Sequence, residues 1–250
     1  MPTVRIKGQY LPGGAPAYYD SVTGEIVSIN APVWFYDDFI GAGHTSIPTT
    51  VSSGSMWVSK IVKTSGTVTV GAIANGANGQ ISLVTDATSE KQDAVFYCFD
   101  QRAFLGSAGL NYETRTQLGV IPTAGTKAVW GLAAAWADGQ NNIAQYLRFA
   151  VNGNGQILCE SQDGTTQLSV NSGVTIGTTT EWHVFRIDAA DPTSVKFYID
   201  GAQVCQTTTF PFAATGANAQ LQPYASVYKA SGTSVGTLNL DFITIWGFRA

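Results

Sequence analysis

Charged side chains are scarce in this sequence. Aspartate, glutamate, lysine and arginine make up 12% of its 250 residues, against about 25% in an average globular protein. The formal net charge is −4, so the chain lacks the concentrated positive field that nucleic-acid binding requires. The composition therefore excludes a nucleic-acid partner. It predicts a surface of serine, threonine, asparagine, glutamine and glycine, which suits strands and packing against other proteins.

Cysteine is equally rare. The three cysteines, Cys98, Cys159 and Cys205, are odd in number and widely spaced, which excludes a disulfide framework. Each lies within an apolar or strand-like run, so we predict reduced and largely buried thiols. No histidine or second cysteine lies near any of them in sequence, and a zinc site is therefore not indicated.

Long apolar runs are absent. No segment approaches the roughly 20 apolar residues of a membrane span, so we expect no membrane partner. Arg5 and Lys7 near the N-terminus have no apolar stretch behind them, which does not indicate a secretory signal. The length suits one large β domain, because all-β sandwiches often reach about 200–250 residues.

Strand periodicity takes the place of helical periodicity. Residues 110–118 alternate cleanly, with Leu110, Tyr112, Thr114, Thr116 and Leu118 on one face. This pattern is typical of a half-buried antiparallel strand. Residues 146–151 repeat it, with leucine, phenylalanine and valine on one face. Residues 128–137 are rich in alanine, but their tryptophans and flanking glycines favour a strand over a helix.

Asparagine-glycine and aspartate-glycine pairs separate the predicted strands. The pair Asp200-Gly201 joins residues 195–200 to residues 202–205, and a type I′ hairpin turn needs positive φ at both of its central residues. Asp191-Pro192 marks a turn before that hairpin. Many short strands joined by such turns predict two packed antiparallel sheets.

The chain divides into two parts, residues 1–33 and residues 34–250. The first part is rich in proline and glycine, and it is predicted to be an extended N-terminal arm. Its apolar residues favour docking on another protein chain, and packing on its own domain as an edge strand is the alternative. The predicted contact residues are Tyr10, Tyr18, Tyr19, Ile26, Val27 and Ile29.

The order of motifs in residues 34–250 resembles the concanavalin A-like family, which includes glucanases, lectins, laminin-G domains and pentraxins. The segments that carry the resemblance are WFYDDF (residues 34–39), NYETRTQL (111–118), WGLAAAWADG (130–139), residues 145–160, the pair WHVFRID and VKFYIDG within 182–201, and LNLDFITIWGFR (238–249). The resemblance implies an all-β fold, a two-sheet antiparallel jelly-roll sandwich. It says little about function, because one scaffold hosts many functions.

The residues of these motifs, together with the arm of residues 1–33 and its TGE turn at residues 23–25, resemble those of structural proteins of tailed bacteriophages. That resemblance implies a non-enzymatic virion protein, such as a capsid decoration, head-fibre or tail protein, assembled in the host cytoplasm. Its partner would be the major capsid protein or another virion protein, and the chain would form homo-oligomers. The alternative is a lectin-like glycan-binding module on a phage head or tail, and a glycoside hydrolase is the third class.

The catalytic acids of glucanases with this fold are missing from the sequence. Those enzymes carry two carboxylates on one face of a Glu-x-Asp-x-x-Glu strand, whereas here Arg115 follows Glu113 at the corresponding spacing. Asp37 and Asp38 are adjacent, so in a strand their side chains point to opposite faces. His183 lies among apolar strand residues and is expected to be packed or hydrogen-bonded. We therefore predict no enzymatic activity.

Two ligand classes remain open for the lectin-like alternative. Carbohydrate binding needs exposed aromatic rings beside polar groups, and Trp136 and Asp138 at a predicted loop are the candidates. Trp182 is expected in the core. Calcium, which some members of the family hold with carboxylates, is a minor alternative at Asp86, Asp138 or Asp163. Because none of these lies in a dense acidic loop, turn carboxylates are the favoured interpretation and no cofactor is predicted.

Overall fold

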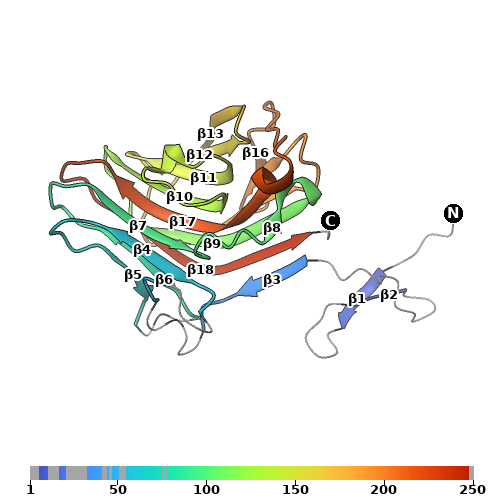
Figure 1. Cartoon of the computed structure of the whole chain (residues 1–250), viewed down its shortest axis with the longest axis horizontal. Coiled ribbons are helices and arrows are strands. Elements are labelled where there is room, and N and C mark those ends of the chain that lie inside the picture. The colour runs from blue at the N-terminus through green and yellow to red at the C-terminus, as the bar shows by residue number, and fades with distance from the viewer. Residues whose placement is uncertain are drawn as a thin grey trace.

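The protein folds as two packed antiparallel sheets (Figure 1). The computed structural model describes residues 6–10, 17–20, 33–40, 44, 47–50, 55–74, 76 and 78–247. Helix in these ranges is confined to short 3-10 turns. No helix found there has the length and apolar character to cross a membrane. The predicted all-β jelly-roll sandwich is confirmed.

The first sheet has eight strands in the order β13-β12-β11-β10-β17-β7-β4, with β8 paired to β17. The strands are β4 (Val58–Val62), β7 (Gln92–Tyr97), β8 (Phe104–Leu105), β10 (Thr126–Ala133), β11 (Tyr146–Asn152), β12 (Gln156–Gln162), β13 (Gln167–Thr175) and β17 (Gln220–Lys229). All of its ladders are antiparallel.

The second sheet also has eight strands, in the order β16-β15-β14-β9-β18-β6-β5, with β3 paired to β18. They are β3 (Val33–Asp37), β5 (Thr69–Ala72), β6 (Ile81–Thr85), β9 (Leu110–Val120), β14 (His183–Ala189), β15 (Lys196–Ile199), β16 (Ala202–Val204) and β18 (Gly236–Gly247). β18 contains residues 238–247 of the motif LNLDFITIWGFR.

The core lies between the sheets and is built on aromatic rings. The rings of Trp130 and Phe185 meet edge-to-face with centroids 4.8 Å apart, and those of Phe149 and Phe197 do so at 5.2 Å. Trp130 and Phe149 come from the first sheet, while Phe185 and Phe197 come from the second. Edge-to-face packing of large rings adds to the free energy gained by burying them.

Local sequence patterns located the strands correctly where one face meets solvent. In β9, Leu110, Tyr112, Thr114, Thr116 and Leu118 are buried and the residues between them are half-buried. This alternation confirms the prediction for residues 110–118.

The hairpin predicted at Asp200-Gly201 is also confirmed. Ile199 pairs with Ala202, and both turn residues have positive φ, 50° and 80°. The preceding turn at Asp191-Pro192 lies between β14 and β15, as predicted. Asp200 also holds His183, whose Nδ1 lies 2.7 Å from Asp200 Oδ2, so His183 is the hydrogen-bonded residue expected.

One side chain, Trp182, and one strand, β11, differ from expectation. Trp182 is half-buried and lies 5.2 Å from the guanidinium of Arg115, so it is not a core residue. Phe185 and Ile187 point into the core, and a strand alternates with a period of two, which turns Trp182 outward. In β11 the residues on both faces are buried, not one face alone.

The N-terminal part contains a two-stranded antiparallel ladder of β1 (Ile6–Tyr10) and β2 (Ala17–Asp20). The predicted contact residues Tyr10, Tyr18 and Tyr19 lie in these strands, and Tyr18 pairs with Gln9. Ile26, Val27 and Ile29 fall outside the described residues. The arm's role in contacting a partner stays a prediction.

The three cysteines form no disulfide. Cys159 is buried, whereas Cys98 and Cys205 are half-buried, so the predicted burial holds fully for Cys159 alone. Burial raises the pKa of Cys98 to about 12 and raises the pKa of Cys159 further.

Native-state thiols are expected to react slowly with a disulfide reagent such as 5,5′-dithiobis(2-nitrobenzoate) at pH 8. Only the thiolate attacks, so for Cys98 and Cys159 we expect a rate at least about a hundredfold below that of free cysteine. Release of the yellow thiolate measures the rate, and guanidinium-unfolded protein is the control. Rapid reaction of Cys98 or Cys159 in the native protein would contradict this expectation.

Candidate functional site

Residues 134–145, which we call the covering loop, lie across the outer face of the first sheet. Their apolar side chains, among them Ala134, Trp136 and Ile143, form a second small core with residues of that face. The sheet residues in this core are Val58, Val95, Tyr97, Val129, Tyr146, Ala150, Leu158 and Tyr224. The covering loop explains why β11 is buried on both faces.

Hydrogen bonds fix the start and the middle of the covering loop to the sheet. Gln222 of β17 donates through Nε2 to the Ala134 carbonyl at 3.0 Å and to Asp100 Oδ1 at 2.9 Å. The same carboxylate accepts from the backbone N–H of Trp136 at 2.8 Å. Farther along, Gln140 Nε2 donates to Ser226 Oγ at 2.9 Å. The loop is therefore held in one place by side chains of the strands beneath it.

Asp93 of β7 is fully buried under the covering loop. Its carboxylate accepts hydrogen bonds from Ser226 Oγ at 2.6 Å and from the indole N–H of Trp136 at 3.1 Å. Burial raises the pKa of Asp93 to about 7, although these two hydrogen bonds act in the opposite direction. The negative charge of Asp138 adds to the increase. A carboxyl group with this pKa exchanges its proton near neutral pH, which is characteristic of functional sites.

The two residues predicted from sequence to bind glycans, Trp136 and Asp138, both lie on the covering loop. Trp136 is half-buried, and the ammonium group of Lys60 lies 4.1 Å from the centre of its ring. Asp138 is exposed and pairs with Lys91 at 2.6 Å. Both charges of that pair are in solvent, so the pair contributes little stability. The glycan-binding role of Trp136 and Asp138 stays a prediction.

A buried ionic cluster of Lys127, Arg148 and Glu160 contacts the covering loop. Glu160 of β12 pairs with Arg148 Nε at 2.7 Å and with Lys127 Nζ at 2.8 Å. Burial alone would raise the pKa of Glu160, but the two positive charges outweigh it and hold that pKa below its usual range. Arg148 also donates to the Gln140 carbonyl at 2.9 Å and lies 3.6 Å from the centre of the Tyr146 ring. The cluster therefore anchors the middle of the covering loop.

An open pocket of about 420 Å³ lies between the covering loop and the neighbouring strand ends. Its walls come from the start of β10, the end of β11, the end of β17 and the loop itself. The lining residues are Gly125, Thr126, Lys127, Gly139, Gln140, Asn141, Asn142, Asn152, Tyr228 and Ala230. Four of these side chains are amides, which both donate and accept hydrogen bonds. Gln140 is 2% exposed, and within the described part of the chain its Oε1 accepts no hydrogen bond.

The acidic residues considered as catalytic candidates, Asp37, Asp38 and Glu113, do not form a pair of facing carboxylates. Asp37 Oδ2 accepts from the Trp57 indole N–H at 2.6 Å and lies 3.0 Å from His44 Nε2. Asp38 accepts instead from the exposed backbone N–H of Ile40. Glu113 lies on β9, in the middle of the second sheet.

Two of the loop aspartates considered for calcium are engaged by backbone N–H groups. Asp163 accepts from Thr165, Thr166 and Ala213. Asp86 accepts from Thr88 at 2.9 Å and from Thr67. Among the residues that the structure describes, no three His, Cys, Asp or Glu side chains gather as a metal site would require.

Sequence reasoning missed Asp93, Gln140 and Tyr228. Asp93 directly precedes the apolar run of residues 94–99, which predicts a buried strand, and an aspartate at the start of such a run is a recognisable signal. The run of amides at residues 140–142 directly after Gly139 is a second one. Neither signal places the residues together, because β7, β17 and the covering loop are far apart in sequence.

No protein-family model and no curated protein sequence matches this chain. Solved structures share its fold. A protein of unknown function from Shewanella oneidensis MR-1 aligns with a TM-score of 0.58 at 14% identity, over 90% of this chain and 92% of its own. A beta-1,3-glucanase from Mycobacterium marinum aligns with a TM-score of 0.54 at 18% identity, over 85% of this chain and 97% of its own.

An endo-β-galactosidase from Clostridium perfringens, described as releasing GlcNAcα1-4Gal, gives a TM-score of 0.54 at 13% identity. The alignment covers 86% of this chain and 63% of that enzyme. At such identities the likeness establishes the common sandwich fold.

Two predictions made from the sequence are contradicted by these neighbours. The chain was expected to be a virion structural protein and to have no enzymatic activity, whereas the structures of known activity named above are glycosidases. The motifs that suggested phage proteins are β3, β9, β10, β14, β15 and β18, whose inward residues pack the core. Such residues specify the scaffold and not what its surface binds.

Proposed function

We propose that this chain is a carbohydrate-active protein that binds a neutral oligosaccharide in the pocket beside the covering loop. The observation that carries the proposal is the lining of that pocket: amide side chains, one tyrosine ring and the buried Gln140, whose Oε1 has no hydrogen-bond partner in the described part of the chain. The fold shared with a beta-1,3-glucanase and an endo-β-galactosidase supports the same ligand class.

Sugar hydroxyl groups both donate and accept hydrogen bonds, and asparagine and glutamine side chains match them in both roles. A tyrosine ring adds an apolar face for the C–H groups of a sugar ring, with a hydroxyl at its edge. The charges around the pocket are already paired. Lys127 pairs with Glu160, and Lys91 pairs with Asp138. A neutral ligand therefore fits better than an anionic one.

Asp138 supports this pocket through the loop backbone. The Asn142 side chain donates to the Asp138 carbonyl at 2.6 Å, which fixes the direction of the amide that lines the pocket. The carboxylate of Asp138 lies at the solvent side in its pair with Lys91. The predicted glycan residue thus belongs to the same loop as the pocket.

Removing a pocket side chain is expected to weaken glycan binding. A glycan array with the full chain identifies the ligand, and calorimetric titration measures affinity. Asn142→Ala and Tyr228→Ala should each raise Kd about tenfold or more, equivalent to about 1.4 kcal/mol. Asn218→Ala, an exposed amide in a distant turn, is the matched control. Unchanged affinity in both pocket variants would reject the pocket as the binding site.

Hydrolysis of the bound glycan is a second candidate function, favoured by Asp93 and Asp138. Glycosidases use one protonated and one ionised carboxyl group. Asp93, with a pKa of about 7, fits the first role, and Asp138, paired with Lys91 at the surface, supplies a second carboxyl group. Because Trp136 covers Asp93, this reaction needs the indole to move aside. Reducing-sugar release from array ligands tests it, and turnover should fall at least about a hundredfold in Asp93→Asn and Asp138→Asn.

A further inference from the structure

Four aromatic side chains form a strip on the outer face of the second sheet, opposite to the covering loop. Trp34 and Tyr36 come from β3, and Phe242 and Trp246 come from β18. Trp34 is 46% exposed and Tyr36 is 51% exposed, while Phe242 and Trp246 are half-buried. We call these four residues the aromatic strip.

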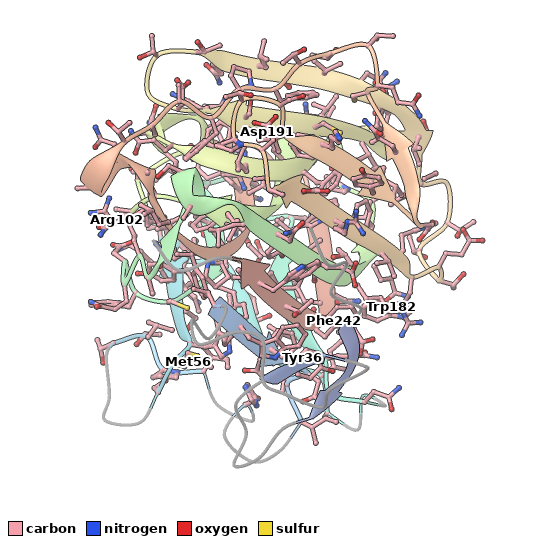
Figure 2. The ribbon with its side chains drawn as sticks, turned by 90° about the vertical axis from the view of Figure 1, so that its right-hand side faces the viewer. Tyr36, Met56, Arg102, Trp182, Asp191 and Phe242 are labelled. Carbon is pink, nitrogen blue, oxygen red and sulfur yellow. The ribbon has the colours of Figure 1, made fainter. Side chains whose placement is uncertain are left out.

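Strand register places the four side chains on two adjacent strands. Trp246 pairs directly with Trp34, and Thr244 pairs with Tyr36. The rings of Tyr36 and Phe242 have centroids 6.2 Å apart, and their planes are tilted by 32°. Figure 2 shows these two residues side by side, with Met56 away from them. The alternate residues of β18, Ile243 and Ile245, are in the core, so the strip is the solvent side of a well-packed sheet.

A row of polar side chains runs along the strip on the neighbouring strand. In β9, Asn111 pairs with Trp246, Glu113 with Thr244 and Arg115 with Phe242. Arg115 is held by Asp241 at 2.8 Å and stacks on Trp182. Glu113 has no hydrogen bond or ion pair among the described residues. The face therefore combines flat apolar rings with hydrogen-bonding groups beside them.

Most of the charges named on this face are paired. Arg115 pairs with Asp241, and Arg186 lies 3.6 Å from Asp188, which leaves Glu113 as the one unpaired charge among them. A single carboxylate does not favour a charged polymer over a neutral one. The strip is also too small for a protein partner. Half-exposed aromatic rings offer roughly 100 Å² each, so four provide about 300–400 Å², whereas a stable interface needs about 800 Å² on each side.

We propose that the aromatic strip is a second glycan-binding surface, which holds an extended neutral polysaccharide chain by stacking sugar rings on its side chains. The inference rests on the proposed function for its ligand class and not for its location. Phe242 to Trp246 span about 13 Å at roughly 3.3 Å per residue, enough for more than one sugar ring. The pocket and the strip lie on the outer faces of different sheets, so each can be disrupted without the other.

Retention on insoluble polysaccharide tests the strip with the full chain. Particles of β-1,3-glucan, chitin, xylan and mannan are incubated with wild type, Trp34→Ala/Tyr36→Ala and Met56→Ala, which removes an exposed apolar side chain outside the strip. Wild type and Met56→Ala are expected to bind at least one polymer, with the double variant bound at least tenfold more weakly. Tyr36→Ala alone, at a half-exposed position, serves if circular dichroism shows that the double variant is unfolded.

The outcomes separate the two sites. Loss of polymer retention in the strip variant, with unchanged Kd for the soluble oligosaccharide, supports the strip. Asn142→Ala and Tyr228→Ala should weaken oligosaccharide binding and leave polymer retention unchanged. If neither variant changes either measurement, the pocket fails while the strip stands. Retention of wild type on no polymer, or equal retention of wild type and strip variant, overturns the inference. A dimer seen by sedimentation in wild type and lost in the strip variant also overturns it.

Discussion

Replacing Arg148 with methionine is expected to lower the free energy of unfolding by about 3 kcal/mol or more. Arg148 is 1% exposed, and its loss leaves the buried Glu160 without its closest positive charge. Removing one partner of a buried ion pair typically costs about 3–5 kcal/mol, because an uncompensated charge stays buried. Lys127, at 2.8 Å from Glu160, keeps the expected loss near the lower limit. Urea unfolding followed by fluorescence measures it.

A double variant separates charge from packing. Arg148→Met combined with Glu160→Gln removes the uncompensated carboxylate, so it should recover a large part of the lost stability. Equal destabilisation of the single and double variants would show that Arg148 acts by packing against Tyr146. The covering loop is also expected to loosen in both variants, because the bond from Arg148 to the Gln140 carbonyl is lost. Hydrogen exchange of residues 134–145 reports that effect.

The folded protein is expected to lose stability as the pH rises from about 4 to about 7, because of Asp93. Its pKa is raised to about 7 in the folded state from an ordinary value of 3.8. A group with a raised folded pKa contributes stability that is fully present below its unfolded pKa and lost as pH rises through its folded pKa. The difference between the two pKa values corresponds to a loss of about 4 kcal/mol in the free energy of unfolding, at about 1.36 kcal/mol per pKa unit. Urea unfolding at a series of pH values measures it.

Asp93→Asn is the matched variant for this prediction. Asparagine keeps the size and the acceptor oxygen of the side chain but does not ionise, so the decline between pH 4 and pH 7 should flatten. The acid limb should remain, because the folded pKa of Glu160 is lowered and its contribution is lost as pH falls. The same slope above pH 5 in wild type and variant would show that Asp93 is not the group responsible.

The fold could be predicted where neighbouring residues contain the whole signal. The alternation in β9 and the Asp200-Gly201 turn are local, because side-chain period and turn φ values depend on adjacent residues alone. The prediction for Trp182 failed at the start of a strand, where a shift of one residue changes the face of the sheet.

The sequence-based prediction of function failed for a different reason. The motifs that resembled phage proteins are strands of the sandwich core, and core residues report how the sheets pack. The missing Glu-x-Asp-x-x-Glu strand excludes only that arrangement of acids. Asp93 comes from another part of the chain, accepts a hydrogen bond from the Trp136 indole and is affected by the charge of Asp138.

Local sequence patterns were enough to specify an all-β chain of low charge, the strands and hairpins of a two-sheet sandwich, and the inward face of each alternating strand. Contacts between distant segments specified the rest. They laid residues 134–145 across the first sheet, buried Asp93 with Ser226 and Trp136, and aligned Trp34 of β3 with Trp246 of β18. These groupings depend on contacts between residues far apart in the chain. No local periodicity encodes them, because they arise when strand order and register are set by packing.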